Sequence, residues 1–332
     1  MSNKIQVKRG LKAQLPTLSV GEPGLTTDTK ELFIGHANGN IGIATSEQLA
    51  DMAQARYGLN ANAMINGNFD IWQRGTVKNN PAFGAFLADR YLISYLPDGG
   101  NFPSNIAHLR LDLTPSEIPN AKYAYRVNTD GAGSGYTDNA SYGIFQRIEN
   151  GTAYLCGAGK KLTITFLARS SIAGKRIGIS LSQRYGSGGS PSDAEPIIGQ
   201  IINLSAVWTK YKVTISTNTL AGKTLGTNND DYFQIGFFML WGSSVASSQF
   251  GGGTAESFRG AGNIDIAQIQ VGAGDADLPF QPRPFSTELA LCQRYFQQRS
   301  INNASPYDIR PSMRISPTIT GSASPYYYDA EL

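Results

Sequence analysis

The chain has 332 residues, of which 41% are hydrophobic and 16% are charged, and its formal net charge is only +3. So small a charge over so long a chain excludes the basic surface by which proteins bind nucleic acid. No apolar run approaches the ~18 residues of a membrane-spanning helix, and the first residues lack the pattern of a secretory signal. The length suggests about two domains, and 37 Gly, 16 Tyr and 15 Phe favour short strands and turns over helical bundles.

Few side chains are available for proton transfer or metal binding. The chain has two histidines, His36 and His108, and two cysteines, Cys156 and Cys292. Neither histidine has a recognisable partner for a Ser-His-Asp or Cys-His arrangement. The cysteines are expected to be reduced, buried thiols of a protein that folds in a cytoplasm. We therefore predict no enzyme, with no catalytic residue, no metal and no cofactor.

Glycoside hydrolysis is the alternative activity, because paired carboxylates need no histidine. Asp193 lies near Glu195, and Asp230 precedes Asp231, but both pairs lie in polar segments typical of solvated loops. The sequence shows no repeat of about 20–30 residues, which an enzyme built on a parallel β-helix would require. A polysaccharide-degrading enzyme is therefore the less favoured interpretation.

Residues 1–45 predict short strands joined by tight turns. Strands are expected at 4–8, 31–35 and 40–44, with turns at 21–24 and at Asn38-Gly39. So few apolar side chains cannot bury enough surface for a domain to be stable alone. Association with further copies of the chain is expected.

A helical neck is predicted over residues 46–62. Thr45 and Gln48 form a capping box, and Gly58 is a plausible end of the helix. The helix is too short to be stable in isolation. Its apolar stripe is assigned to an interface between chains and consists of Leu49, Met52 and Ala53.

Residues 63–284 have the pattern of an antiparallel β-sandwich. Alternating apolar residues predict strands at 105–113, 161–170, 175–183, 206–216, 231–241 and 263–271. In the first of these, Ala107 and Leu109 share one face and His108 lies on the other. In the last, the apolar phase changes after Ile266, which predicts a β-bulge. No helix-length segment interrupts the strands, so a parallel α/β sheet is excluded.

Residues 285–332 predict a short helix and a polar tip. Ser286 or Thr287 is expected to cap the helix, and Leu289, Cys292 or Gln293, and Phe296 are expected to share one side. The tail that follows is rich in proline and ends near three consecutive tyrosines.

Five tyrosines beside polar loops are candidates for carbohydrate binding, because sugar rings stack on flat aromatic side chains. They are Tyr185, Tyr232, Tyr326, Tyr327 and Tyr328. Packing against the sandwich or a neighbouring chain is the alternative for each. A structural calcium ion near Asp265 is a further open alternative.

Residues 5–43 resemble the N-terminal module of phage tail fibres and of the phage major tropism determinant. The shared elements are Arg9-Gly10, Gly21-Glu22, Gly24, Asp28-Thr29 and Ile34-Gly35. The resemblance implies a β-prism formed by three chains, with the N-terminus attached to the phage tail.

Residues 64–296 resemble a phage tail-fibre sandwich domain, through MINGNFDIWQRGT, ADRY, FQRIE, LTITFLAR and ELALCQRYF. This resemblance implies a jelly-roll sandwich similar to carbohydrate-binding modules. In relatives, residues corresponding to 313–319 open a further small β-region.

Together the resemblances imply a homotrimeric, non-enzymatic tail fibre or fibre-like virion protein, assembled in the host bacterial cytoplasm. Its expected partners are other phage tail or baseplate proteins and a host-surface glycan or receptor. The alternatives are a polysaccharide-degrading tailspike and a purely structural tail or collar decoration protein.

Overall fold

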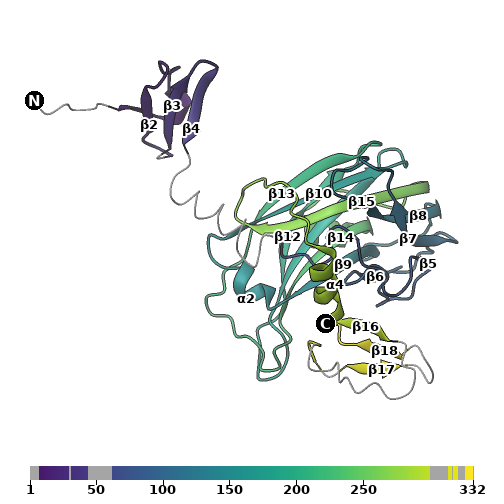
Figure 1. Cartoon of the computed structure of the whole chain (residues 1–332). Coiled ribbons are helices and arrows are strands. Elements are labelled where there is room, and N and C mark those ends of the chain that lie inside the picture. Colours follow the sequence, from purple (N-terminus) through teal and green to yellow (C-terminus); the bar gives the residue numbers. More distant parts are fainter. Residues whose placement is uncertain are drawn as a thin grey trace, which may run out of the picture. The chain divides into compact units, whose positions relative to one another are not determined.

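The computed structural model describes residues 7–29, 31–43, 62–299, 313–315, 317–320 and 326–331. The chain divides into two compact units, residues 1–61 and 62–332. Strands dominate both units (Figure 1), which confirms the predicted all-β class. Within the described ranges, no helix is long and apolar enough to cross a membrane.

The N-terminal unit is a four-stranded sheet. Its strands, adjacent in this order, are β1 (Lys8–Gly10), β2 (Pro23–Thr26), β3 (Leu32–His36) and β4 (Gly39–Ile43), and a short 3-10 helix, η1 (Lys12–Gln14), follows β1. β1 and β2 are parallel, and the other neighbours are antiparallel.

Two predictions for this unit are corrected. The first strand begins at Lys8 within the described residues, and the expected turn at 21–24 ends early, because Pro23 and Gly24 belong to β2. Close packing, and not a turn, favours glycine at position 24, since a Cβ there would lie 2.9 Å from Leu18 Cδ1. The predicted neck stripe of Leu49, Met52 and Ala53 lies outside the described residues.

One face of the N-terminal sheet is apolar and largely uncovered. The strand register places five aliphatic side chains on it, Leu25, Leu32, Ile34, Ile41 and Ile43, which we call the apolar face. Ile41 is 50% exposed and Ile43 is 44% exposed. The opposite face packs on Leu18, which is the one fully buried hydrophobic side chain in the described part of this unit.

The second unit is a sandwich of two antiparallel sheets (Figure 1). The six-stranded sheet consists, in spatial order, of β13 (Thr209–Ser216), β10 (Lys161–Ser170), β15 (Gly260–Ala273), β8 (Tyr123–Gly131), β7 (Ile106–Asp112) and β5 (Val77–Asn79). The five-stranded sheet consists of β12 (Glu195–Asn203), β11 (Arg176–Arg184), β14 (Tyr232–Trp241), β9 (Ser141–Glu149) and β6 (Leu92–Leu96). A short helix, α2 (Gly151–Leu155), follows β9.

The core between the sheets follows from strand alternation. Ile177, Ile179 and Leu181 of β11 are buried there, together with alternate residues of the neighbouring strands. The alternation predicted in β7 is confirmed, but the side chain that faces the core is His108. Its Nδ1 lies 2.8 Å from the Tyr125 hydroxyl, and its Nε2 lies 2.7 Å from the Tyr142 hydroxyl. These bonds let a polar ring occupy the core.

The predicted bulge in β15 is confirmed. Thr165 pairs with Gln270, whereas Leu167 pairs with Ala267, so β15 carries one extra residue. Gln268 takes the left-handed conformation at this point, with φ at +50°. The expectation of uninterrupted strands is wrong in one respect, because an eight-residue helix, α3 (Ser243–Phe250), follows β14.

The C-terminal region contains α4 (Phe285–Gln293) and a three-stranded sheet of β16 (Phe296–Arg299), β18 (Tyr326–Asp329) and β17 (Thr318–Thr320). Neither Ser286 nor Thr287 caps α4, since Pro284 is the N-cap and its carbonyl accepts the first N–H groups.

This region is anchored to the sandwich through the buried side chain of Arg90. The guanidinium pairs with Glu331, donates to the Arg147 carbonyl at 2.6 Å and lies 3.5 Å over the Tyr295 ring. A buried cation needs such partners to offset its lost hydration.

Candidate functional site

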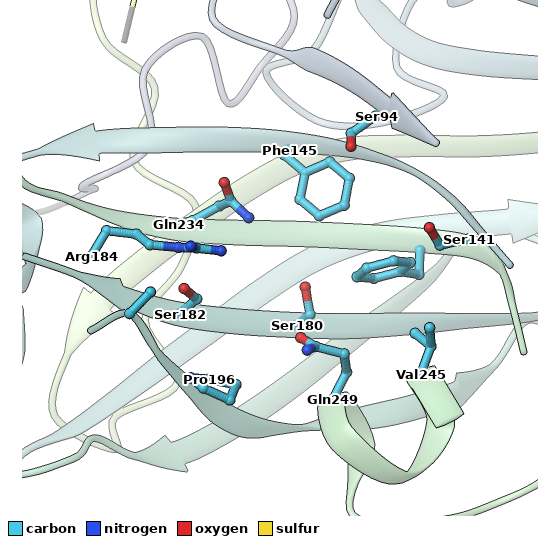
Figure 2. A pocket seen from close by; sticks show the side chains of 12 residues that line it. Ser94, Ser141, Phe145, Ser180, Ser182, Arg184, Pro196, Gln234, Val245 and Gln249 are labelled. Atoms are coloured by element: carbon cyan, nitrogen blue, oxygen red, sulfur yellow. The ribbon is translucent and has the colours of Figure 1, made fainter. Parts of the chain in front are cut away.

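A cleft with a volume of about 330 Å³ lies on the outer face of the five-stranded sheet (Figure 2). Outward-facing side chains of four strands form its floor, and residues of β12 and α3 form its sides. The lining residues are Ser94, Ser141, Phe145, Ser180, Ser182, Arg184, Ala194, Pro196, Gln234, Phe238, Val245 and Gln249.

Small residues on the outer positions of the strands make this face hollow. In β11, Ser180 and Ser182 alternate with the core residues Ile179 and Leu181, so their short side chains point outward. Gly236 in the neighbouring strand has no side chain, and a Cβ there would lie 2.3 Å from the Phe145 ring. The Phe145 ring therefore occupies the space that a larger residue at 236 would fill.

Helix α3 closes one end of the cleft through a cluster of apolar side chains. The cluster consists of Leu92, Phe145, Phe238, Trp241, Ala246 and Phe250. The ring centroids of Phe145 and Phe238 lie 5.1 Å apart in an edge-to-face contact. Because Phe145 and Phe238 also line the cleft, this end of the floor offers aromatic surface to a ligand.

The other end of the cleft is polar, and some of its groups have no partner. The Oγ of Ser182 and the Nε of Arg184 are buried and accept or donate no hydrogen bond within the described parts of the chain. Gln234 lies directly across from Ser182 in the strand register. Buried polar groups are nearly always hydrogen-bonded, so this end has capacity for a ligand rich in oxygen atoms.

Tyr185 is buried rather than exposed, in contrast to the prediction from sequence. Its side chain is 2% exposed, and its hydroxyl donates to Glu195 at 2.7 Å and accepts from Gln183 at 2.9 Å. Burial raises the pKa of Tyr185 to about 12. The ring therefore presents no face on which a sugar could stack.

The other four tyrosines lie outside the cleft as well. Tyr232 is partly exposed, and the guanidinium of Arg147 lies 5.0 Å from the centre of its ring. Tyr326, Tyr327 and Tyr328 belong to β18, the central strand of the C-terminal sheet, and Tyr327 stacks on Phe296 with ring centroids 6.2 Å apart. The structure thus places these three residues in a strand, where the sequence suggested a tip.

Neither candidate carboxylate pair lines the cleft. Glu195 is paired with Lys223 and accepts from Tyr185, and these two contacts lower its pKa. Asp230 accepts from the Ser187 hydroxyl and backbone N–H, which lower its pKa, whereas burial raises the pKa of Asp231.

The carboxylate of Asp265 is held by two arginines. It accepts from Arg126 at 2.7 and 2.8 Å and from Arg169 at 2.9 Å, so its oxygens already have donors. Within the described residues, no group of three or more His, Cys, Asp and Glu side chains could hold a metal ion.

The cleft residues were not predicted from the sequence. The available signal was the outer positions of β11, where Ser180 and Ser182 alternate with Ile179 and Leu181 and are followed by Arg184. These residues can be recognised as the floor of a cleft only once the order of the neighbouring strands is known.

Comparison with known proteins gives one family match, to the major tropism determinant N-terminal domain over residues 5–36. This match confirms the resemblance of the N-terminal residues to that module. No curated protein matches the chain.

Several solved structures resemble the sandwich. One, described as "CBM4 structure and function", is 17% identical with a TM-score of 0.34 and covers 63% of this chain and 98% of its own. A family 11 carbohydrate-binding module from Clostridium thermocellum, in complex with a mixed-linked tetrasaccharide, is 12% identical with a TM-score of 0.32 and covers 59% and 95%. A putative sugar binding protein from Bacteroides thetaiotaomicron is 11% identical with a TM-score of 0.34 and covers 64% and 100%. These similarities concern the fold.

Proposed function

We propose that the protein is a trimeric, non-enzymatic tail fibre or fibre-like protein of a phage virion, and that its sandwich recognises a host-surface glycan. The match of residues 5–36 to a tropism determinant domain supports a role in host recognition. The cleft on the five-stranded sheet is the observation that carries the glycan-binding part of the proposal.

The chemistry of the cleft suits a sugar. Its aromatic end, with Phe145 and Phe238, can pack against the apolar C–H faces of sugar rings. Its polar end offers hydroxyl, amide and guanidinium groups to the sugar hydroxyls. A volume of about 330 Å³ falls at the lower end of the range of small-ligand pockets. None of the lining residues is Asp or Glu, which supports binding without the carboxylate pair that hydrolysis uses.

The trimeric state in this proposal is supported by the apolar face of the N-terminal sheet. Five aliphatic side chains on one side of a small sheet form a patch that soluble monomers seldom leave open. Three identical faces meeting around one axis would bury this patch. The N-terminal unit would then both join the three chains and attach them to another virion protein.

Filling the cleft tests the proposal. We expect the full-length protein to bind members of a microbial glycan array, and we expect Ser182→Trp to lose this binding because the indole would occupy the cleft. Ser216→Trp is the matched control, since it makes the same change at an exposed position of the six-stranded sheet. Undiminished binding by Ser182→Trp would contradict a site in the cleft, and a wild-type protein that binds no glycan would contradict the proposed function.

A further inference from the structure

We propose that the cleft selects glycans that carry an anionic group, a carboxylate or a phosphate, and that Arg184 binds this group. The inference rests on the proposed glycan binding and adds the chemical class of the ligand. Among the lining residues Arg184 is the one charged side chain.

The first argument is the lack of a counter-charge for Arg184. Its guanidinium forms no ion pair or hydrogen bond with any residue in the described ranges, and its Nε is buried. Arg176 lies on the same strand and the same face, but its Nε donates to Glu256 at 2.5 Å. Arg169 and Arg126 likewise share Asp265. Arg184 thus differs from these three arginines, which the fold uses as structural partners.

The second argument is that the one acidic residue of the neighbouring strand β12 is already engaged. Glu195, at the start of the adjacent strand β12, is paired with Lys223 and bonded to Tyr185. Its charge is therefore neutralised by another residue. A partly buried cation without a partner is costly, and an anionic ligand would relieve that cost.

The third argument is the set of donors around Arg184. Figure 2 shows Ser182 and Gln234 at the same end of the cleft as Arg184. The planar guanidinium can bind a carboxylate or a phosphate through two parallel hydrogen bonds. The Ser182 hydroxyl, which has no partner of its own, and the Gln234 amide could donate to the same anion. A neutral sugar would leave the guanidinium without a counter-ion.

The first experiment compares charged and neutral forms of one glycan. The full-length protein is applied to a microbial glycan array, and the strongest acidic ligand is then titrated by calorimetry. For a carboxylate, the neutral form is prepared by carbodiimide activation and borohydride reduction, and for a phosphate by enzymatic dephosphorylation. We expect the neutral form to bind about tenfold or more weakly, consistent with the loss of a charge-assisted bond. Weaker binding after reduction identifies the bound group as a carboxylate, and weaker binding after dephosphorylation identifies it as a phosphate.

The second experiment removes the charge from the protein. Arg184→Gln is expected to bind the acidic glycan about tenfold more weakly and so to lose its preference for the acidic over the neutral form, and circular dichroism with thermal unfolding shows that the variant is folded. Arg184→Lys keeps the charge but not the two-bonded geometry, so it should retain part of the preference. The control Lys212→Gln removes one positive charge from an exposed position of β13 and should change neither affinity.

Two outcomes would overturn the inference while leaving glycan binding intact. One is a wild-type protein that binds charged and neutral forms equally or binds only neutral glycans. The other is an Arg184→Gln variant that keeps the full preference for the acidic form. If no glycan binds at all, the proposed function itself fails.

Discussion

His108, in the core of the sandwich, shows how burial sets the protonation state of a side chain. His108 is fully buried, and both of its ring nitrogens face tyrosine hydroxyls. Burial lowers the pKa of His108 to about 3. The imidazole is therefore neutral at physiological pH, with one nitrogen donating a hydrogen bond and the other accepting one.

His108 should make stability depend on pH. Its pKa in the unfolded chain is near the ordinary value of 6.5 and in the folded chain about 3. Between these values the unfolded state binds a proton that the native state does not, so the free energy of unfolding falls as the pH falls. One such group contributes a slope of about 1.4 kcal/mol per pH unit.

We expect His108→Gln to remove this contribution, because glutamine can donate and accept hydrogen bonds without titrating. Urea unfolding of both proteins at several pH values between about 4 and 7.5 measures the two slopes. If the free energy of unfolding changes equally with pH in both proteins, the pH dependence does not come from His108.

At the level of elements, helix α3 is positioned by a glycine in the sheet beneath it. A Cβ at Gly178 would lie 2.2 Å from Cζ of Phe250, so the ring rests directly on the backbone of β11. The same helix carries Val245 and Gln249, which line the cleft. The geometry of the cleft therefore depends on a residue that does not itself line it.

Gly178→Ala should displace α3. Overpacking of this kind costs about 1–3 kcal/mol of stability, and glycan affinity should fall with it because two lining residues move. The double variant Gly178→Ala/Phe250→Leu replaces the Phe250 ring by a smaller side chain and should recover part of the lost stability. Gly272→Ala is the control, since nothing lies within 4 Å of a Cβ at that position. Denaturant unfolding of the four proteins gives the comparison, and a Gly178→Ala variant as stable as Gly272→Ala would refute the packing argument.

The strands that the sequence predicts correctly include β10 and β11, whose inward residues alternate without interruption. Strand β12 was missed because its isoleucines stand at 197, 198, 201 and 202, a spacing closer to that of a helix. The register between β11 and β12 shifts here, between Ile179 and Leu181. An irregularity of this kind disrupts the alternation that prediction relies on.

The candidate site was harder to predict than the fold, for a physical reason. Alternation identifies the residues that face the core, whereas the cleft is made by outward residues of four strands that are distant in sequence. Tyr185 illustrates the difficulty, since its place beside a Gly/Ser loop suggested exposure. The contacts with Glu195 and Gln183 that bury its hydroxyl are visible only in three dimensions.

At the scale of the whole molecule, the proposed assembly depends on the apolar face of the N-terminal sheet. We expect light scattering on the full-length protein to give close to three times the chain mass of 35.7 kDa. Ile41→Asp should produce monomers, because burying an unpaired carboxylate against aliphatic side chains is unfavourable. Val20→Asp introduces the same charge at a 75% exposed position off the apolar face and should remain trimeric. A monomeric wild type, or a trimeric Ile41→Asp variant, would contradict this role of the face.

The floor of the cleft also bears on how such a protein could change its target. Ser94, Ser180, Ser182 and Gln234 project from strands whose alternate residues form the core, so each can be replaced with little effect on the packing between the sheets. Substitutions at these positions can then change ligand recognition with little effect on the stability of the sandwich. Under the proposed function, single substitutions along one rigid sheet would be enough to alter host range, without the insertions and rearrangements that a loop-built site requires.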